Sequence, residues 1–97
     1  MTNKEEIRKK LVEHKDKLQK KFRVKEIGLF GSYVRGEQKG SSDVDMLVEF
    51  EETPTLLEFI ELENYLTELL GVKVDLVMKR ALKPKIREQV LKEVVYV

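Results

Sequence analysis

Two aspartates, Asp43 and Asp45, stand at the start of the apolar segment DVDMLVEF. Alternate side chains of a strand point to the same face, so their α-carbons would lie about 6.5 Å apart. Two carboxylates at this spacing repel by about 2–3 kcal/mol at an effective dielectric near 20. A divalent cation would offset that repulsion, and Mg²⁺ is held by one or two carboxylates plus waters and phosphates. The pair predicts a magnesium site, with a solvated loop or strand end as the simpler alternative.

A third carboxylate, Asp75, lies within the segment VKVDLVM. In a strand it would point away from its neighbours Val74 and Leu76, which predicts opposite faces for the apolar residues and the aspartate. If this strand lies beside the one that carries Asp45, Asp75 completes a cluster of three carboxylates. An outward-facing polar residue, like Lys73, is the alternative for Asp75.

A Gly-Ser pair, Gly31 and Ser32, follows the apolar segment VKEIGLF and precedes the short segment SYVRG. The pattern predicts a strand, a turn and a short helix capped by Ser32 and ended by Gly36. The first amides of such a helix attract anions, so a phosphate would fit there. Ser32 as a helix cap alone is the alternative, and Arg35 is either a substrate contact or a surface ion-pair partner.

The Gly-Ser segment is not a P-loop, because Glu37 and Gln38 occupy the places of the Lys and the Ser or Thr that a P-loop requires. A phosphate-binding turn, a pair of aspartates on one face and a third strand aspartate share one economical explanation. That explanation is metal-assisted phosphoryl or nucleotidyl transfer.

Alternating helical and strand patterns in the sequence predict the secondary-structure elements that position these residues. Thr2 and Glu5 resemble a capping box before a helix that reaches about Phe22. The residues of the 55–71 segment with apolar helical spacing are Leu56, Phe59, Ile60, Leu66, Leu69 and Leu70, with Gly71 ending the helix. Pro84 opens a last helix through about Lys92. The expected strands are 24–30, 43–50 and 72–78. The order α-β-α-β-α-β-α predicts an α/β (α+β) fold with a small mixed sheet, three-stranded or slightly larger, covered by helices.

Length and composition narrow the class of protein. A chain of 97 residues suits one domain, expected to be 1–97. It has no apolar run of the roughly 20 residues that cross a membrane and no apolar signal-peptide core, so we expect a cytoplasmic protein with no membrane partner. With no cysteine and the single histidine His14, a thiolate or histidine-rich metal site is excluded, and any metal must be bound by oxygen.

The distribution of charge argues against a nucleic-acid partner. Residues 37–75 carry two Lys or Arg against eleven Asp or Glu, although the whole chain has a net charge of +1. A reader of duplex DNA usually presents a dominant basic face, because neutralised phosphates supply most of its affinity. The acidic middle of this chain does not fit that requirement.

The segment GSYVRGEQKGSSDVDMLVEF resembles the signature of the DNA polymerase beta-like nucleotidyltransferase superfamily, which is G-S, ten residues, D-x-D and a carboxylate on a later strand. More narrowly, G-S-x-x-R-G followed by S-D-x-D in about a hundred residues looks like the minimal nucleotidyltransferases, or MNT proteins. These are antitoxins found beside HEPN-domain toxins. The resemblance covers essentially the whole chain and implies the nucleotidyltransferase fold.

The resemblance also implies a reaction and the residues that perform it. Asp43, Asp45 and Asp75 would be the catalytic residues and the ligands of Mg²⁺, with two cations expected. The residues expected to bind the nucleotide are Gly31, Ser32, Arg35 and Ser42. ATP would donate AMP to a tyrosine of a HEPN toxin, releasing pyrophosphate and neutralising the toxin.

Two alternatives to this reaction stay open. The chain could be a toxin-binding module with the same fold that acts by forming a complex, with little catalysis. It could also be a small-molecule nucleotidyltransferase of the antibiotic type, although such enzymes usually carry an added acceptor domain. A protein partner could meet the apolar tail 94–97, for which an edge strand or core packing is the alternative. It could also meet the acidic side chains of the 55–71 helix, which are Glu58, Glu61, Glu63 and Glu68.

Overall fold

The computed structural model describes residues 3–97, whose four strands form one mixed sheet. The strands are β1 (Val24–Phe30), β2 (Val44–Phe50), β3 (Val74–Met78) and β4 (Val95–Tyr96). Their order in the sheet is β3-β2-β1-β4. Strand β1 runs antiparallel to both β2 and β4, and β2 runs parallel to β3. The mixed α/β class is therefore confirmed, with one strand more than the three that the sequence marks clearly.

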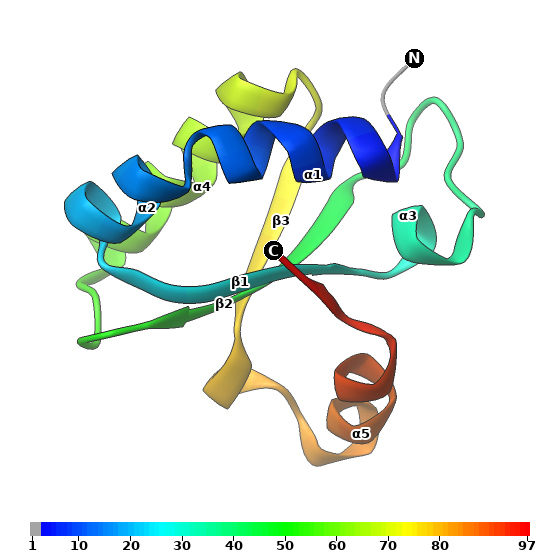
Figure 1. Cartoon of the computed structure of the whole chain (residues 1–97). Helices are drawn as coiled ribbons and strands as arrows, with labels where there is room; N and C mark the ends of the chain where they lie inside the picture. The colour runs from blue at the N-terminus through cyan, green and yellow to red at the C-terminus, as the bar shows by residue number, and fades with distance from the viewer. Residues whose placement is uncertain (1–2) are drawn as a thin grey trace.

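Helices cover both faces of this sheet (Figure 1). One face carries three of them, whose apolar residues form the main core with Met46 and Val48. These are α1 (Lys4–Glu13), α2 (Lys15–Phe22) and α4 (Leu56–Leu70). The other face carries α5 (Pro84–Glu93), after the short 3₁₀ turn η1 (Lys79–Ala81). The four-residue helix α3 (Ser32–Arg35) directly follows β1. None of the helices within 3–97 is long and apolar enough to cross a membrane.

The alternation of side chains in β2 separates core residues from candidate site residues. Val44, Met46 and Val48 are buried in the main core, whereas Leu47 packs with Val90 of α5 in a second, smaller core. Asp45 shares the face of Leu47, because alternate residues of a strand point to the same side. The carboxylate therefore lies on the face that α5 covers only in part.

The first helical region differs from its prediction. Thr2 lies outside the described residues, and the side chain that caps α1 is that of Asn3, which accepts a hydrogen bond from the Glu6 N–H at 3.0 Å. The prediction of a single helix up to Phe22 was wrong, because His14 (φ −108°, ψ 12°) leaves the helical conformation and separates α1 from α2. The predicted end at Phe22 is confirmed, since Arg23 takes the left-handed conformation there.

The buried face of α4 also differs from its prediction. Leu56 and Ile60 were expected in the core but are 77% and 41% exposed, whereas Leu62, which the prediction omitted, is fully buried. The buried stripe consists of Leu62, Leu66 and Leu70, four residues apart. Leucines or isoleucines occur at almost every turn of this helix, so their spacing alone did not single out one face. The start is fixed by a complete capping box between Thr55 and Glu58.

The free edge of β3 is bound by side chains of α4. The Val74 N–H donates to Thr67 Oγ1 at 3.1 Å, and the Leu76 N–H donates to Glu63 Oε2 at 3.0 Å. Backbone groups of an edge strand otherwise need water or another strand. Glu63 and Glu58 thus have structural hydrogen bonds, which weakens the suggestion that the acidic face of this helix serves a partner.

The apolar tail forms the opposite edge of the sheet, as one of its two expected roles. Residues of β4 pair with Gly28 and Leu29 of β1. A Cβ at Gly28 would lie only 2.7 Å from Val94 Cγ2 and 3.0 Å from the Val95 carbonyl oxygen. Glycine is therefore required at position 28 for the tail to approach β1 this closely.

The observed core predicts different costs for two substitutions in one helix. We expect Leu62→Ala to lower the free energy of unfolding by about 2–5 kcal/mol, because it opens a cavity in the core. We expect Leu56→Ala, at an exposed position of the same helix, to change it by less than about 0.5 kcal/mol. Urea denaturation of both variants measures the difference, and equal costs would contradict the assigned buried face.

Candidate active site

The parallel pairing of β2 and β3 places two of the predicted carboxylates side by side. Asp45 and Asp75 are direct partners in the register of these strands. Asp75 points away from the buried Val74 and Leu76, as its sequence position predicts. Residues opposite each other on neighbouring strands share a face of the sheet, so both carboxylates lie on the side of α5.

Asp43 lies just before β2, where the strand pairing begins. The next residue, Val44, donates its N–H to the carbonyl oxygen of Lys73 at 2.9 Å, and the Asp43 Oδ2 atom lies 4.0 Å from Lys73 Nζ. Asp43 is half-buried and close enough to Asp45 to repel its charge. The structure thus brings both Asp43 and Asp75 close enough to Asp45 for their charges to act on it.

Gly31 joins the turn after β1 to this group of carboxylates. Its backbone (φ 79°, ψ −154°) lies in a region that is essentially restricted to glycine. A Cβ here would overlap Asp45 Oδ2 and lie 3.0 Å from Asp45 Cγ. The Asp45 carboxylate therefore occupies the space that the missing side chain of Gly31 leaves.

Helix α3 starts at Ser32, but the predicted cap was wrong. Gly31 is the N-cap residue, and no side-chain hydrogen bond caps the helix. Glycine supplies the required backbone angles, so the Ser32 hydroxyl has no capping role in this arrangement. The predicted end at Gly36 is confirmed, with Gly36 in the left-handed conformation. Ser32 thus lies directly beside the Gly31 turn with its hydroxyl free of the capping role.

Glu93, at the last residue of α5, contacts the turn and was not predicted. Its Oε2 atom accepts a hydrogen bond from the Gly31 N–H at 2.8 Å, and its Oε1 atom accepts one from Arg35 Nη1 at 2.9 Å. The Glu93 side chain is only 14% exposed. No sequence signal links residues 31 and 93, because only the return of α5 and β4 to β1 brings them together.

The other two candidate nucleotide contacts form bonds of their own. Arg35 donates from Nε to Glu37 Oε1 at 2.9 Å besides its bond to Glu93, so the ion pair named as its alternative is present. These contacts, first to Glu37 and then to Glu93, raise the pKa of Arg35. The Ser42 hydroxyl accepts a hydrogen bond from the Lys39 N–H at 2.8 Å and closes the loop before Asp43.

The electrostatics of the carboxylates favour a bound cation. Burial, then the charges of Asp75 and Asp43, raise the pKa of Asp45, while Arg35 lowers it. Burial alone would raise the pKa of Glu93, but the hydrogen bonds from Gly31 and Arg35 hold it below its usual value. The negative charge of Asp45 is thus only partly compensated, by Arg35.

The donor atoms fit a hard cation such as Mg²⁺, which prefers carboxylate oxygens and keeps waters and phosphate oxygens as further ligands. Among residues 3–97, no three acidic or histidine side chains are gathered into a complete metal site. A cation here would therefore depend on ligands from water or a nucleotide, as Mg²⁺ commonly does. The assignment of Asp43, Asp45 and Asp75 as metal ligands stays a prediction.

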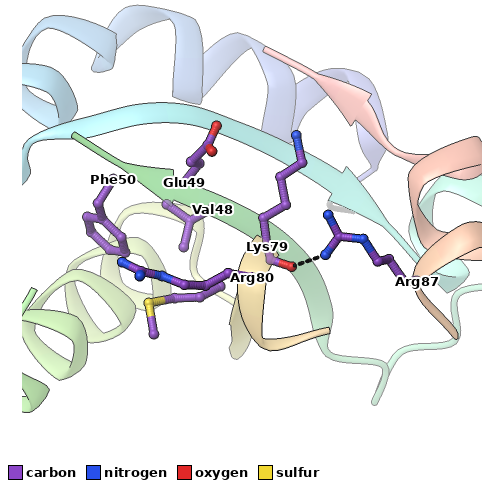
Figure 2. A pocket seen from close by; sticks show the side chains of 7 residues that line it. Val48, Glu49, Phe50, Lys79, Arg80 and Arg87 are labelled. Atoms are coloured by element: carbon purple, nitrogen blue, oxygen red, sulfur yellow. Dashed lines mark hydrogen bonds between the residues drawn. The ribbon is translucent and has the colours of Figure 1, made fainter. Parts of the chain in front are cut away.

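A pocket of about 490 Å³ lies at the other end of β2 and β3 (Figure 2). Arg87 Nη1 donates there to the Lys79 carbonyl oxygen at 3.2 Å, and Arg80 donates to Thr53 Oγ1. The lining residues are Val48, Glu49, Phe50, Met78, Lys79, Arg80 and Arg87. None of the predicted site residues lines this pocket, so it lies apart from the Gly31 turn.

The contact between Gly31 and Asp45 predicts a difference between two glycines with positive φ. Gly36→Ala has open space around its new Cβ and should lower the free energy of unfolding by about 1 kcal/mol. Gly31→Ala should cost about 3 kcal/mol or more, because it adds backbone strain and displaces the Asp45 carboxylate. Thermal and urea denaturation of both variants test this, and similar losses would contradict the close packing of Asp45 on the turn.

The raised pKa of Asp45 predicts a pH dependence of stability. The folded chain binds the Asp45 proton more tightly than the unfolded chain, so this group destabilises the fold as pH rises through its folded pKa. Asp45→Asn should therefore be more stable than the parent at pH 7 without metal. The difference in stability should vanish below pH 3.8, which is the ordinary pKa of an aspartate. Melting temperatures across this pH range measure it.

The exposed Asp16, which pairs with Lys20 at 3.2 Å, provides the matched control. Asp16→Asn should lose at most about 0.5 kcal/mol at pH 7, as expected for an exposed helical pair. A loss of stability at pH 7 in Asp45→Asn would show that the carboxylate is not under electrostatic strain.

The sequence of this chain matches a known protein family over most of its length. Residues 11–97 match the family described as Nucleotidyltransferase domain. The protein adenylyltransferase MntA of Thermococcus cleftensis is 63% identical over 93 residues, which are 96% of this chain and 94% of that protein. The similarity thus extends over nearly the full length of both chains.

Solved structures share the fold. The structure of a candidate minimal nucleotidyltransferase superposes with a TM-score of 0.81 at 41% identity, covering 97% of this chain and 95% of that one. A toxin–antitoxin structure with AMP-PNP gives a TM-score of 0.72 at 30% identity, covering 91% and 69% of the two chains. A tri-AMPylated HEPN toxin of Shewanella oneidensis in complex with its MNT antitoxin gives 0.66 at 25% identity, covering 93% and 70%.

The family match covers most of the chain, including the Gly31 turn and the strands that carry Asp45 and Asp75. The sequence similarity to the Thermococcus relative covers nearly the whole of this chain. This chain belongs to the nucleotidyltransferase domain family, as the G-S and D-x-D residues of its sequence indicate.

Proposed function

We propose that this chain is a Mg²⁺-dependent protein adenylyltransferase that acts as an antitoxin, transferring AMP from ATP to a tyrosine of a HEPN-type toxin. The observation that carries the proposal is the position of the Asp45 carboxylate, which lies beside Asp75 and directly against the Gly31 turn. Carboxylates that hold cations and a turn that receives phosphates must adjoin for phosphoryl transfer. The cytoplasmic location expected from the sequence, and a single domain spanning 1–97, stay predictions.

The relatives support the reaction and the partner. The Thermococcus relative is named a protein adenylyltransferase, and the Shewanella complex contains an AMPylated HEPN toxin. AMP-PNP, an ATP analogue, is bound in another toxin–antitoxin structure of this fold. ATP as the donor and a HEPN toxin as the acceptor therefore suit this chain better than a small molecule does.

The residues of the site have distinct roles in this proposal. Asp43, Asp45 and Asp75 would hold Mg²⁺, which when bound neutralises the charge of the phosphates and of the developing transition state. The residues that would contact the triphosphate are Gly31, Ser32, Arg35 and Ser42. Ser42 would act mainly by closing the loop that presents Asp43, since its hydroxyl accepts from Lys39.

The transfer forms one bond and breaks one. The tyrosine oxygen attacks the α-phosphorus of ATP, and the bond from that phosphorus to the β-phosphate bridging oxygen breaks, releasing pyrophosphate. Asp75, the carboxylate of the edge strand β3, would accept or relay the tyrosine proton. Because Asp75 is exposed at this edge, an acceptor carried by another protein can reach it.

The test is transfer of labelled AMP to a purified HEPN toxin, followed by intact-mass analysis. The parent chain with ATP and Mg²⁺ should add AMP to the toxin, and replacing the acceptor tyrosine with phenylalanine should prevent the addition. The Asp43→Asn, Asp45→Asn double variant should lose about 100-fold or more in rate, because several kcal/mol of charge stabilisation disappear. Asp16→Asn, at an exposed position that is distant in sequence from the aspartates of the site, should retain the parent rate.

Two outcomes would contradict the proposal. Full activity of the double variant would remove the metal assignment of the aspartates. A tight complex with the toxin that never gains the mass of AMP would instead favour a binding module that neutralises its partner by covering it.

A further inference from the structure

One carboxylate joins the two groups that the proposed function assigns to phosphate binding. Glu93 accepts from the Gly31 N–H with one oxygen and from Arg35 Nη1 with the other, at 2.8 Å and 2.9 Å. Hydrogen bonds of this length with a charged partner are among the stronger ones in proteins. The turn and the guanidinium are therefore held in a fixed relation by a residue that lies 62 positions after Gly31.

Glu93 is itself fixed from both sides along the chain. Before it, Val90 of α5 is buried against Leu47 in the second core. After it, Val94 lies over Gly28, and β4 pairs with β1. The backbone on either side of Glu93 is thus anchored to the same two strands that present Gly31 and Asp45.

The negative charge of Glu93 strengthens its hydrogen bonds to the turn but also repels the nearby aspartate carboxylates. It is close enough to Asp45 for their charges to repel, which adds to the repulsion from Asp75 and Asp43. A neutral or apolar residue would avoid that repulsion and would suit a site where the side chain is only 14% exposed. The two hydrogen bonds to Gly31 and Arg35 are the compensation that the structure shows.

The bonds of Arg35 leave donors for a ligand. Glu37 accepts from Nε and Glu93 from Nη1, and neither bond uses Nη2. A guanidinium carries five N–H donors in a rigid plane, so fixing two of its nitrogens sets the direction of the remaining donors. Glu93 and Glu37 together therefore determine where Arg35 can present an N–H to a phosphate.

We propose that Glu93 is a positioning residue of the nucleotide site, whose carboxylate holds the Gly31 turn and the Arg35 guanidinium in place beside Asp45 for the triphosphate. This inference rests on the proposed function, because it takes Gly31 and Arg35 as phosphate contacts. The contacts that define this role are those of Glu93 with Gly31 and Arg35. Glu93 acts through the two groups that it binds.

The test compares Glu93→Ala and Glu93→Gln with Glu88→Gln, a control on the same helix. Glu88 is 81% exposed and pairs with Lys92 at 3.1 Å. Glu93→Ala should lower kcat/KM for ATP by about 10- to 100-fold, the range expected when a supporting residue is lost, mainly through a higher KM. The kcat/KM of Glu93→Gln should lie between those of the parent and Glu93→Ala, because the amide oxygen of glutamine still accepts a hydrogen bond from Gly31. The kcat/KM of Glu88→Gln should match that of the parent.

A second measurement separates positioning from stability and does not depend on AMP transfer. Amide hydrogen exchange of Gly31 should speed up at least about tenfold in Glu93→Ala and much less in Glu93→Gln, at a temperature well below the melting point of each variant. Calorimetric affinity for ATP with Mg²⁺ should weaken in the same order. If Glu93→Ala is poorly folded, the nearly isosteric Glu93→Gln still carries the comparison.

Each result has a clear meaning. Unchanged Gly31 exchange, or unchanged KM and ATP affinity in both folded Glu93 variants, would overturn the positioning role. A parent chain that binds ATP, with affinity sensitive to Glu93, but transfers no AMP to a toxin would contradict the proposed function while supporting this inference. A parent chain that binds no ATP would overturn both.

Discussion

The arrangement of the candidate site depends on the absence of one side chain. At position 31 the backbone turns sharply after β1, and the Asp45 carboxylate fills the space where a Cβ would stand. The antiparallel pair Phe30–Asp45 brings β2 to this turn, and the parallel pair Asp45–Asp75 adds β3. Each of these alignments would be displaced by a larger residue at the turn. The packing of a carboxylate on a glycine therefore couples the turn that is proposed to receive phosphates to the carboxylates that are proposed to hold a cation.

Ion pairing is uneven within this small region. Arg35 pairs with Glu37 and Glu93. Within residues 3–97, Asp43, Asp45 and Asp75 have no arginine ion pair, and the lysine near Asp43 is exposed and 4.0 Å away. Burial and neighbouring charges consequently raise the pKa of Asp45. In the proposed function, a bound cation would supply the positive charge that these aspartates lack.

Local sequence signals identified the strands and the chemistry better than the packing of the helices. The limits of β1 followed from a short apolar segment that ends at Gly31. The parity of Asp75 followed from alternation, because a strand has a period of two. The buried face of α4 did not, since its leucines exceed what one face can hold and only packing selects Leu62 over Leu56. Ser32 was expected to cap α3, but the unusual angles of Gly31 took that role. Glu93 could not be found from local patterns, because its partners are distant in sequence.

Two outward-facing amides of β3 donate hydrogen bonds to Thr67 and Glu63, and the two-residue β4 shields part of β1 at the opposite edge of the sheet. Strand addition, by which many proteins recruit an extended peptide, requires such amides to be vacant. Binding of a foreign strand alongside β3 would first have to displace two side chains of α4. Addition of a strand at the β3 edge, from another macromolecule or from a second copy of the chain, is therefore disfavoured.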